Sequence, residues 1–125
     1  MTKTVLIVDD NSYIRRALYE LFAREADFVV CGQAEDGKQA IEKAVELRPD
    51  LIVLDLSMPV MNGVDAAREL KRLLPSVALI MYSAFGDILP KQEARRAGVS
   101  EVVSKSESGV TLVSTARRLL FPDAA

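Results

Sequence analysis

Histidine is absent from all 125 residues, so no imidazole can act as general base, metal ligand or phosphate carrier. This absence excludes the many hydrolase designs whose catalytic base is a histidine. Any chemistry in this chain must therefore depend on carboxylates, hydroxyls and lysine.

Cysteine occurs once, at Cys31, so the chain cannot form an intramolecular disulfide. A chain with one thiol is typical of a reducing compartment. Cys31 lies in the apolar run 28–31, which favours a buried structural thiol, because a reactive thiolate needs nearby positive charge and access to solvent.

Long apolar runs are also missing: none approaches the length of a membrane span, and a strand-like run that begins by Thr4 leaves no signal peptide. The 16 basic and 18 acidic residues nearly balance, which gives no electrostatic reason for a nucleic-acid or membrane partner. We expect a soluble, cytoplasmic protein. Its length suits one domain with its own core, spanning residues 1–125.

Five apolar runs alternate with five amphipathic segments. Strands are predicted over 4–8, 28–31, 51–55, 77–81 and 99–103. A helix follows each strand, starting near Asn11 or Ser12, Asp36, Asn62, Asp87 and Ser108 and ending near Ala26, Pro49, Pro75, Gly98 and Pro122. In the first helix we expect Arg15, Arg16, Glu20 and Arg24 on the polar side. The alternation predicts an α/β fold, a doubly wound five-stranded parallel sheet with helices on both faces.

Polar side chains stand at the carboxyl ends of four predicted strands, at Asp9 and Asp10, Asp55, Ser83 and Lys105. In the flavodoxin-like strand order 2-1-3-4-5, strands one and three are neighbours about 4.8 Å apart, and the edge between them binds ligands. Asp10 and Asp55 then lie side by side.

Two carboxylates about 5 Å apart repel by roughly 3 kcal/mol at an effective dielectric near 20, so these acids call for a cation. Mg²⁺ fits, because it takes oxygen ligands and keeps positions for water and a phosphate. Lys105 and Ser83 can hold further phosphate oxygens. Asp55 is then free to attack phosphorus and form an acyl phosphate.

These motifs resemble a response-regulator receiver domain over essentially the whole chain, and five pieces in order make a specific match. The matching pieces are Asp9-Asp10, Asp55-Leu-Ser-Met-Pro59 with Gly63, Ser83-Ala84 and Lys105. The resemblance implies a CheY-like fold and phosphorelay signal transduction in a two-component system. A sensor histidine kinase, or a phosphotransfer protein, would supply the phosphoryl group.

The resemblance also implies a role for each site residue. Asp55 is the phosphoacceptor, Asp10 binds Mg²⁺ directly, and Asp9 assists through water. Ser57 lends its backbone carbonyl to the metal. The last two roles fall to Ser83, which senses the phosphoryl group, and to Lys105, which pairs with it.

Partners follow from the same resemblance: a downstream protein target or a fused output domain, and pairing of two copies. Receivers often use the surface of the fourth helix, fifth strand and fifth helix for such contacts. On that surface lie Arg95, Arg96, Arg117 and Arg118, for which ordinary solvated charge is the alternative reading.

Three positions depart from the receiver pattern. Val102 stands where receivers commonly carry an aromatic residue that moves inward on activation. Ser106 follows Lys105, where proline is common. Phe85, two residues after Ser83, is bulky and apolar, and we expect it to slow loss of the phosphoryl group by hydrolysis.

Two other classes of function remain open from the residues alone. A phosphohydrolase of the haloacid dehalogenase type also places an aspartate after a buried strand. That family carries a second acid two residues later, and in this chain Ser57 stands at that position. An adaptor with the receiver fold would be read by its partners without phosphorylation, and Val102 and Ser106 are compatible with that class.

Overall fold

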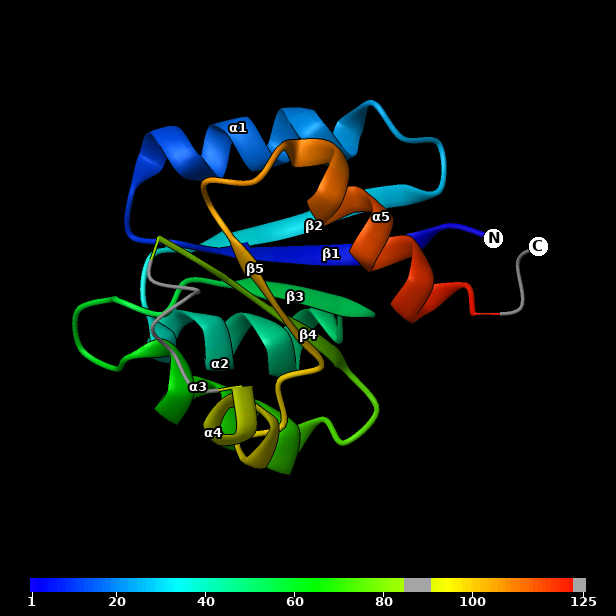
Figure 1. Cartoon of the computed structure of the whole chain (residues 1–125). Coiled ribbons are helices and arrows are strands. Elements are labelled where there is room, and N and C mark those ends of the chain that lie inside the picture. The colour runs from blue at the N-terminus through cyan, green and yellow to red at the C-terminus, as the bar shows by residue number, and fades with distance from the viewer. Residues whose placement is uncertain (85–90, 123–125) are drawn as a thin grey trace.

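Five parallel strands form one sheet in the order β2-β1-β3-β4-β5 (Figure 1). The computed structural model describes residues 1–84 and 91–122, and all element statements refer to these residues. The strands are β1 (Lys3–Val8), β2 (Phe28–Ala34), β3 (Leu51–Leu54), β4 (Ala78–Ser83) and β5 (Glu101–Ser104). The helices are α1 (Ser12–Ala23), α2 (Gly37–Leu47), α3 (Gly63–Leu73), α4 (Lys91–Arg96) and α5 (Gly109–Leu120). The predicted α/β fold and strand order are confirmed.

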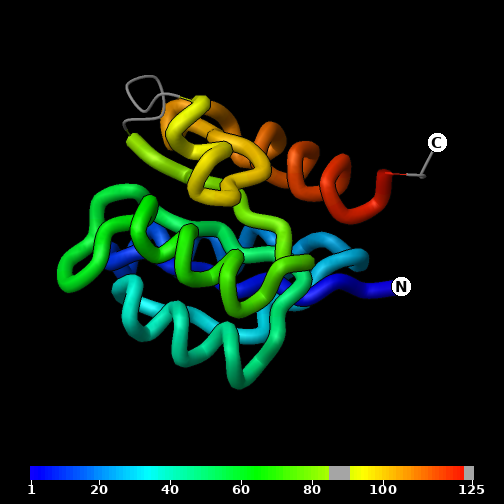
Figure 2. Tube along the Cα trace, turned by 90° about the horizontal axis from the view of Figure 1, so that it is seen from below, coloured from blue at the N-terminus to red at the C-terminus, as the bar shows by residue number. Residues whose placement is uncertain are grey.

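The helices cover both faces of the sheet. Helices α1 and α5 lie on one face and α2, α3 and α4 on the other, as the two views agree (Figures 1 and 2). Successive strand residues point to opposite faces, so Val5 and Ile7 join the core under α1 and α5, whereas Leu6 and Val8 join the core under α2 and α3. Burial on both faces explains why these strands are continuous apolar runs.

Side-chain caps fix three helix starts at the predicted residues. Asn11 accepts hydrogen bonds from the backbone of Tyr13 and Ile14 at the start of α1. Asp36 and Asn62 cap α2 and α3 in the same way. Ser108 occupies the cap position of α5 but makes no side-chain cap bond. Asp87 and Phe85 lie outside the described residues.

Strand β2 is longer than predicted, because it continues past Cys31 to Ala34. Its register against β1 shifts by one residue between Val30 and Gly32, and the ladder then runs on to the end of β1. This edge strand is only partly buried along most of its length, so the polar Gln33 fits within it. The apolar run therefore marked only the first half of the strand.

Strand β5 begins two residues later than predicted, at Glu101 rather than Val99. The backbone N–H of Val99 donates to the carbonyl of Ala94 in α4, so Val99 belongs to the turn that ends this helix. Gly98, with a φ of 97°, makes that turn as a C-cap. The apolar signal at Val99 comes from core packing, not from pairing in the sheet.

Cys31 is partly buried and packs against the core under α2 and α3. Burial raises the pKa of its thiol, which disfavours the reactive thiolate. Among the described residues, no helix is both long enough and apolar enough to cross a membrane.

Candidate functional site

Three carboxylates meet at the carboxyl ends of β1 and β3, which are neighbours in the sheet. Carboxylate oxygens of Asp9, Asp10 and Asp55 all lie within 4.8 Å of one another. Asp9 is 1% exposed and Asp55 is 5% exposed, while Asp10 faces solvent. The backbone N–H of Asp55 donates to the carbonyl of Val8 at 2.9 Å, so the strand ladder itself places Asp55 beside Asp9.

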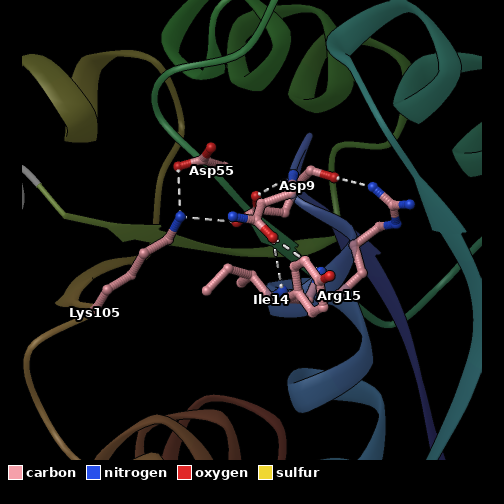
Figure 3. Close-up of polar contacts among 7 residues, drawn as sticks. Asp9, Ile14, Arg15, Asp55 and Lys105 are labelled. Atoms are coloured by element: carbon pink, nitrogen blue, oxygen red, sulfur yellow. Dashed lines mark hydrogen bonds and ion pairs between the residues drawn. The ribbon is translucent and has the colours of Figure 1, made fainter.

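Lys105 joins this cluster from the end of β5 (Figure 3). Its Nζ donates to Oδ2 of Asp9 at 2.8 Å and to Oδ1 of Asp55 at 3.2 Å. Its side chain is 20% exposed, and its backbone N–H donates to the carbonyl of Ser83 at 3.0 Å. One ammonium group therefore bridges two buried carboxylates, and water can still reach it.

Electrostatics follow from this geometry. Burial, and then the charge of Asp9, raise the pKa of Asp55 above the usual carboxyl range, although Lys105 opposes the shift. Burial by itself would lower the pKa of Lys105, but its hydrogen bond to Asp9 and the charge of Asp55 outweigh burial and raise it. Lys105 is therefore a fixed cation at neutral pH, and Asp55 carries a costly negative charge.

Ser83 and Ser57 flank the three acids. Ser83 is 1% exposed at the end of β4, where it lies opposite Ser104 in the register with β5. Ser57 is exposed in the loop after Asp55, beside a groove of about 440 Å³ that Met58 and Glu93 also line. The sheet thus brings together the predicted Asp9, Asp10, Asp55 and Lys105, with Ser83 at the end of the adjoining strand.

Gly63 lets α3 begin directly against the phosphoacceptor candidate. A Cβ at this position would stand 2.3 Å from the carbonyl oxygen of Asp55 and 2.8 Å from the Cα of Leu56, both backbone atoms. The N–H of Gly63 donates to the carbonyl of Leu56 at 2.7 Å. No side chain fits there without moving the main chain that carries Asp55.

Lys105 lies between two serines, Ser104 at the end of β5 and Ser106 in the turn that follows. The Oγ of Ser104 accepts from the backbone N–H of Ser106 at 3.2 Å and lies 2.7 Å from the Oγ of Ser106. The N–H of Glu107 donates to the carbonyl of Ser104 at 3.1 Å. Hydroxyl and backbone hydrogen bonds therefore shape this turn, in which Ser106 stands where proline is common.

Val102 packs partly buried against the core on the α4 side of the sheet. The hollow around it, lined also by Ala94 and Val99, holds about 10 Å³. This is about the smallest space that takes one water molecule, so Val102 packs closely against these neighbours.

Arg15, on the polar side of the first helix, makes a contact that the sequence analysis did not predict. Its side chain is 15% exposed and its Nη1 donates to the backbone carbonyl of Asp9 at 2.7 Å. Arg15 thus stays on the polar side of α1, but its guanidinium contacts the backbone of the loop that carries the acids instead of extending into solvent.

The residues present suit a magnesium ion. Asp9, Asp10 and Asp55 offer only oxygen ligands, and one of them faces solvent. Mg²⁺ binds through one or two carboxylates and keeps several water molecules, so a partly open oxygen site meets its requirements. These three acids are the groups that could hold it.

An acidic cluster at the edge of a sheet ordered 2-1-3-4-5, bridged by one lysine, defines the receiver class of phosphoacceptor domain. The chain belongs to the response regulator receiver domain family, which it matches over residues 5–117. Members of this family act as phosphoacceptors in two-component signalling rather than as metabolic enzymes. Family membership therefore sets aside the phosphohydrolase alternative.

Individual relatives agree with this assignment. The chain is 39% identical to the chemotaxis protein CheY of Thermotoga maritima over 105 residues, which cover 84% of this chain and 87% of that protein. It is 36% identical to the response regulator protein VraR of Staphylococcus aureus over 94% of its own length, but it spans only 56% of VraR. The response regulator domain of Thermotoga maritima CheB superposes with a TM-score of 0.89 at 29% identity, covering 97% of this chain and 98% of that one.

Proposed function

We propose that Asp55 accepts a phosphoryl group from a phosphohistidine on a sensor kinase or a phosphotransfer protein. The observation that supports this role is the bridge from Lys105 to Asp9 and Asp55, with Asp10 within 4.8 Å of both acids. A buried nucleophile next to a fixed cation and two further acids suits phosphoryl transfer, in which positioning and charge stabilisation supply most of the catalysis.

In this proposal an oxygen of Asp55 attacks phosphorus, a phosphorus–oxygen bond forms, and the phosphorus–nitrogen bond to the donor imidazole breaks. Lys105 leaves Asp55 to pair with the incoming phosphoryl oxygens, and the hydroxyl of Ser83 donates to another. Bound Mg²⁺ would neutralise negative charge on the phosphoryl group. Asp10 would be its direct ligand, with the carbonyl of Ser57, and Asp9 would assist through water.

We further propose that residues 1–125 work as one receiver unit in the cytoplasm. Phosphorylation would shift the chain between two conformations that a downstream protein or a fused output domain distinguishes. The arginines of α4 and α5, together with β5, are the surface we propose for that contact or for pairing of two copies. The match covers only 56% of VraR, so VraR contains further sequence. This supports a fused output domain as one of the two arrangements, the other being a separate downstream protein.

Acetyl phosphate with Mg²⁺ tests the proposal. We expect the protein to take up a single phosphoryl group, detected as one mass increment, and the Asp55→Asn variant to take up none. Glu42→Gln, an exposed acid on α2, is the matched control and should label like the wild type. Uptake that persists in Asp55→Asn would refute Asp55 as acceptor, and no uptake by the wild type would favour the adaptor that is read without phosphorylation.

A further inference from the structure

Arg15 contacts the backbone of the loop that carries Asp9 and Asp10, and it has no part in the roles proposed above. Its side chain is 15% exposed, whereas that of Arg16, the next residue in α1, is 82% exposed. Burying a guanidinium removes much of its hydration, so a buried arginine needs a partner that compensates for this loss. The identity of that partner indicates what Arg15 does.

The main partner of Arg15 is a backbone carbonyl. Its Nη1 donates to the carbonyl oxygen of Asp9 at 2.7 Å, as Figure 3 shows. Its Nη2 also lies 3.8 Å from a carboxylate oxygen of Glu35, but the side chain of Glu35 is 62% exposed. Water screens such an ion pair strongly, so the short bond to Asp9 dominates.

This bond completes the fixation of Asp9. The N–H of Asp9 donates to the carbonyl of Ala34 at 3.1 Å, and its Oδ1 accepts from the N–H of Asn11 at 2.9 Å. With Arg15 on the carbonyl, the backbone N–H, the carbonyl and the carboxylate of Asp9 all have partners. The carbonyl that Arg15 holds belongs to the peptide that joins Asp9 to Asp10.

Asp10 depends on that peptide. Its side chain is exposed, and within residues 1–84 and 91–122 its carboxylate takes no hydrogen bond and no ion pair, although it lies within 4.8 Å of the carboxylates of Asp9 and Asp55. Three acids repel one another at such distances. The main chain must therefore hold Asp10 in place.

We propose that Arg15 is a positioning residue for the cation site. By holding the peptide between Asp9 and Asp10, it keeps the carboxylate of Asp10 beside those of Asp9 and Asp55. This inference depends on the cation site of the proposed function. The expected result is opposite to that of charge alone. A positive charge near the site repels a divalent cation, so removing the charge of Arg15 would by itself tighten Mg²⁺ binding.

Mg²⁺ titration by calorimetry tests the inference, with urea unfolding of the metal-free protein measured in parallel. Arg15→Met keeps the apolar stem and removes the donor, and Arg16→Met is the matched control on the exposed neighbour. We expect Arg15→Met to bind Mg²⁺ about tenfold more weakly, the lower end of the range for residues that orient metal ligands. Arg16→Met should stay within about twofold of the wild type.

Three results would overturn the inference. Equal or tighter Mg²⁺ binding by folded Arg15→Met would do so, as would a loss of stability without a change in affinity, which marks a purely structural arginine. If Arg15→Met does not fold, Arg15→Gln is measured in its place. We expect Arg15→Gln to bind Mg²⁺ more weakly than the wild type, and unchanged binding would contradict the inference. Absence of Mg²⁺ binding by the wild type would refute the cation site itself, which separates that failure from the failure of Arg15.

Discussion

Asp55 shows how function and stability conflict at a single residue. The carboxyl group is 5% exposed, and burial together with the charge of Asp9 raises its pKa. A nucleophile must be ionised, so the protein maintains a charge that its own fold disfavours. Lys105 reduces this conflict without removing it.

We predict that Asp55→Asn stabilises the metal-free protein at neutral pH. An unfolded aspartate titrates near 3.8 and the folded pKa is higher, so stability falls as the pH rises from the unfolded value, and the full cost is present above the folded pKa. The gain should appear as a higher free energy of unfolding for Asp55→Asn, because that variant has no carboxylate to keep ionised in the buried site. Urea unfolding as a function of pH measures it, and the gain should vanish below the unfolded pKa.

The exposed Glu42→Gln variant on α2 is the control and should show no such pH-dependent gain. An Asp55→Asn protein that is equally stable or less stable than the wild type at neutral pH would contradict the raised pKa.

The serine turn after β5 leads to a second prediction for single residues. Ser104→Ala removes the oxygen that accepts from the N–H of Ser106, so the backbone at Lys105 should become less well fixed. We expect labelling by acetyl phosphate to slow several-fold, with a loss of unfolding free energy of about 1 kcal/mol or less. Ser104→Thr keeps the hydroxyl and should restore the rate. Equal rates for all three proteins would show that the turn does not direct Lys105.

Among the elements, the junction between β3 and α3 brings main chain close against main chain. We predict that Gly63→Ala costs about 2 kcal/mol of unfolding free energy, because its Cβ would stand 2.3 Å from a backbone oxygen of Asp55. It should also reduce labelling of Asp55. Urea unfolding and acetyl phosphate assays measure the two effects.

Gly109→Ala is the matched control, also at the first residue of a helix. Its Cβ would meet only the flexible end of Leu21, at 2.9 Å, so we expect a change within about 0.5 kcal/mol. Equal stability of the two variants would mean that the main chain near Asp55 yields easily.

The elements also show how far sequence reasoning reached. Alternating apolar and amphipathic segments predicted the fold, and the cap residues Asn11, Asp36 and Asn62 predicted three helix starts, because these signals are local. The polar half of β2 escaped prediction, since an edge strand needs no continuous apolar run. Val99 was predicted to begin a strand because it is apolar, but it is apolar because it packs in the core, and β5 begins at Glu101.

Within the site, the acids and Lys105 could be predicted because each follows an apolar strand. The contact of Arg15 could not, since periodicity assigns an arginine to the polar side and cannot say that this side faces another loop. The hydroxyl bonds of Ser104 depend on the turn that the chain actually adopts. Local sequence patterns thus predict the reactive groups, whereas the groups that orient them can be identified only from tertiary contacts.

At the scale of the whole molecule, the site joins distant parts of the chain. Lys105 and Asp9 are separated by 96 positions in sequence, yet they are hydrogen-bonded. An unfolded chain cannot keep the three acids together, so a cation that they bind stabilises only the folded state.

We therefore predict that Mg²⁺ raises the thermal midpoint of the wild type. At a concentration one hundred times its dissociation constant, the stabilisation should be about 2.7 kcal/mol. Asp10→Asn should lose most of this effect, while the exposed control Glu42→Gln keeps it. Differential scanning calorimetry with and without Mg²⁺ measures it, and equal shifts for all three proteins would place the cation elsewhere.

The acidic pocket also accounts for the formal net charge of the molecule. The chain holds 16 basic and 18 acidic residues, and setting aside the three acids and the lysine of the pocket leaves fifteen of each. The formal net charge of −2 is thus the charge of the pocket itself. One bound divalent cation would therefore make the entire chain formally neutral.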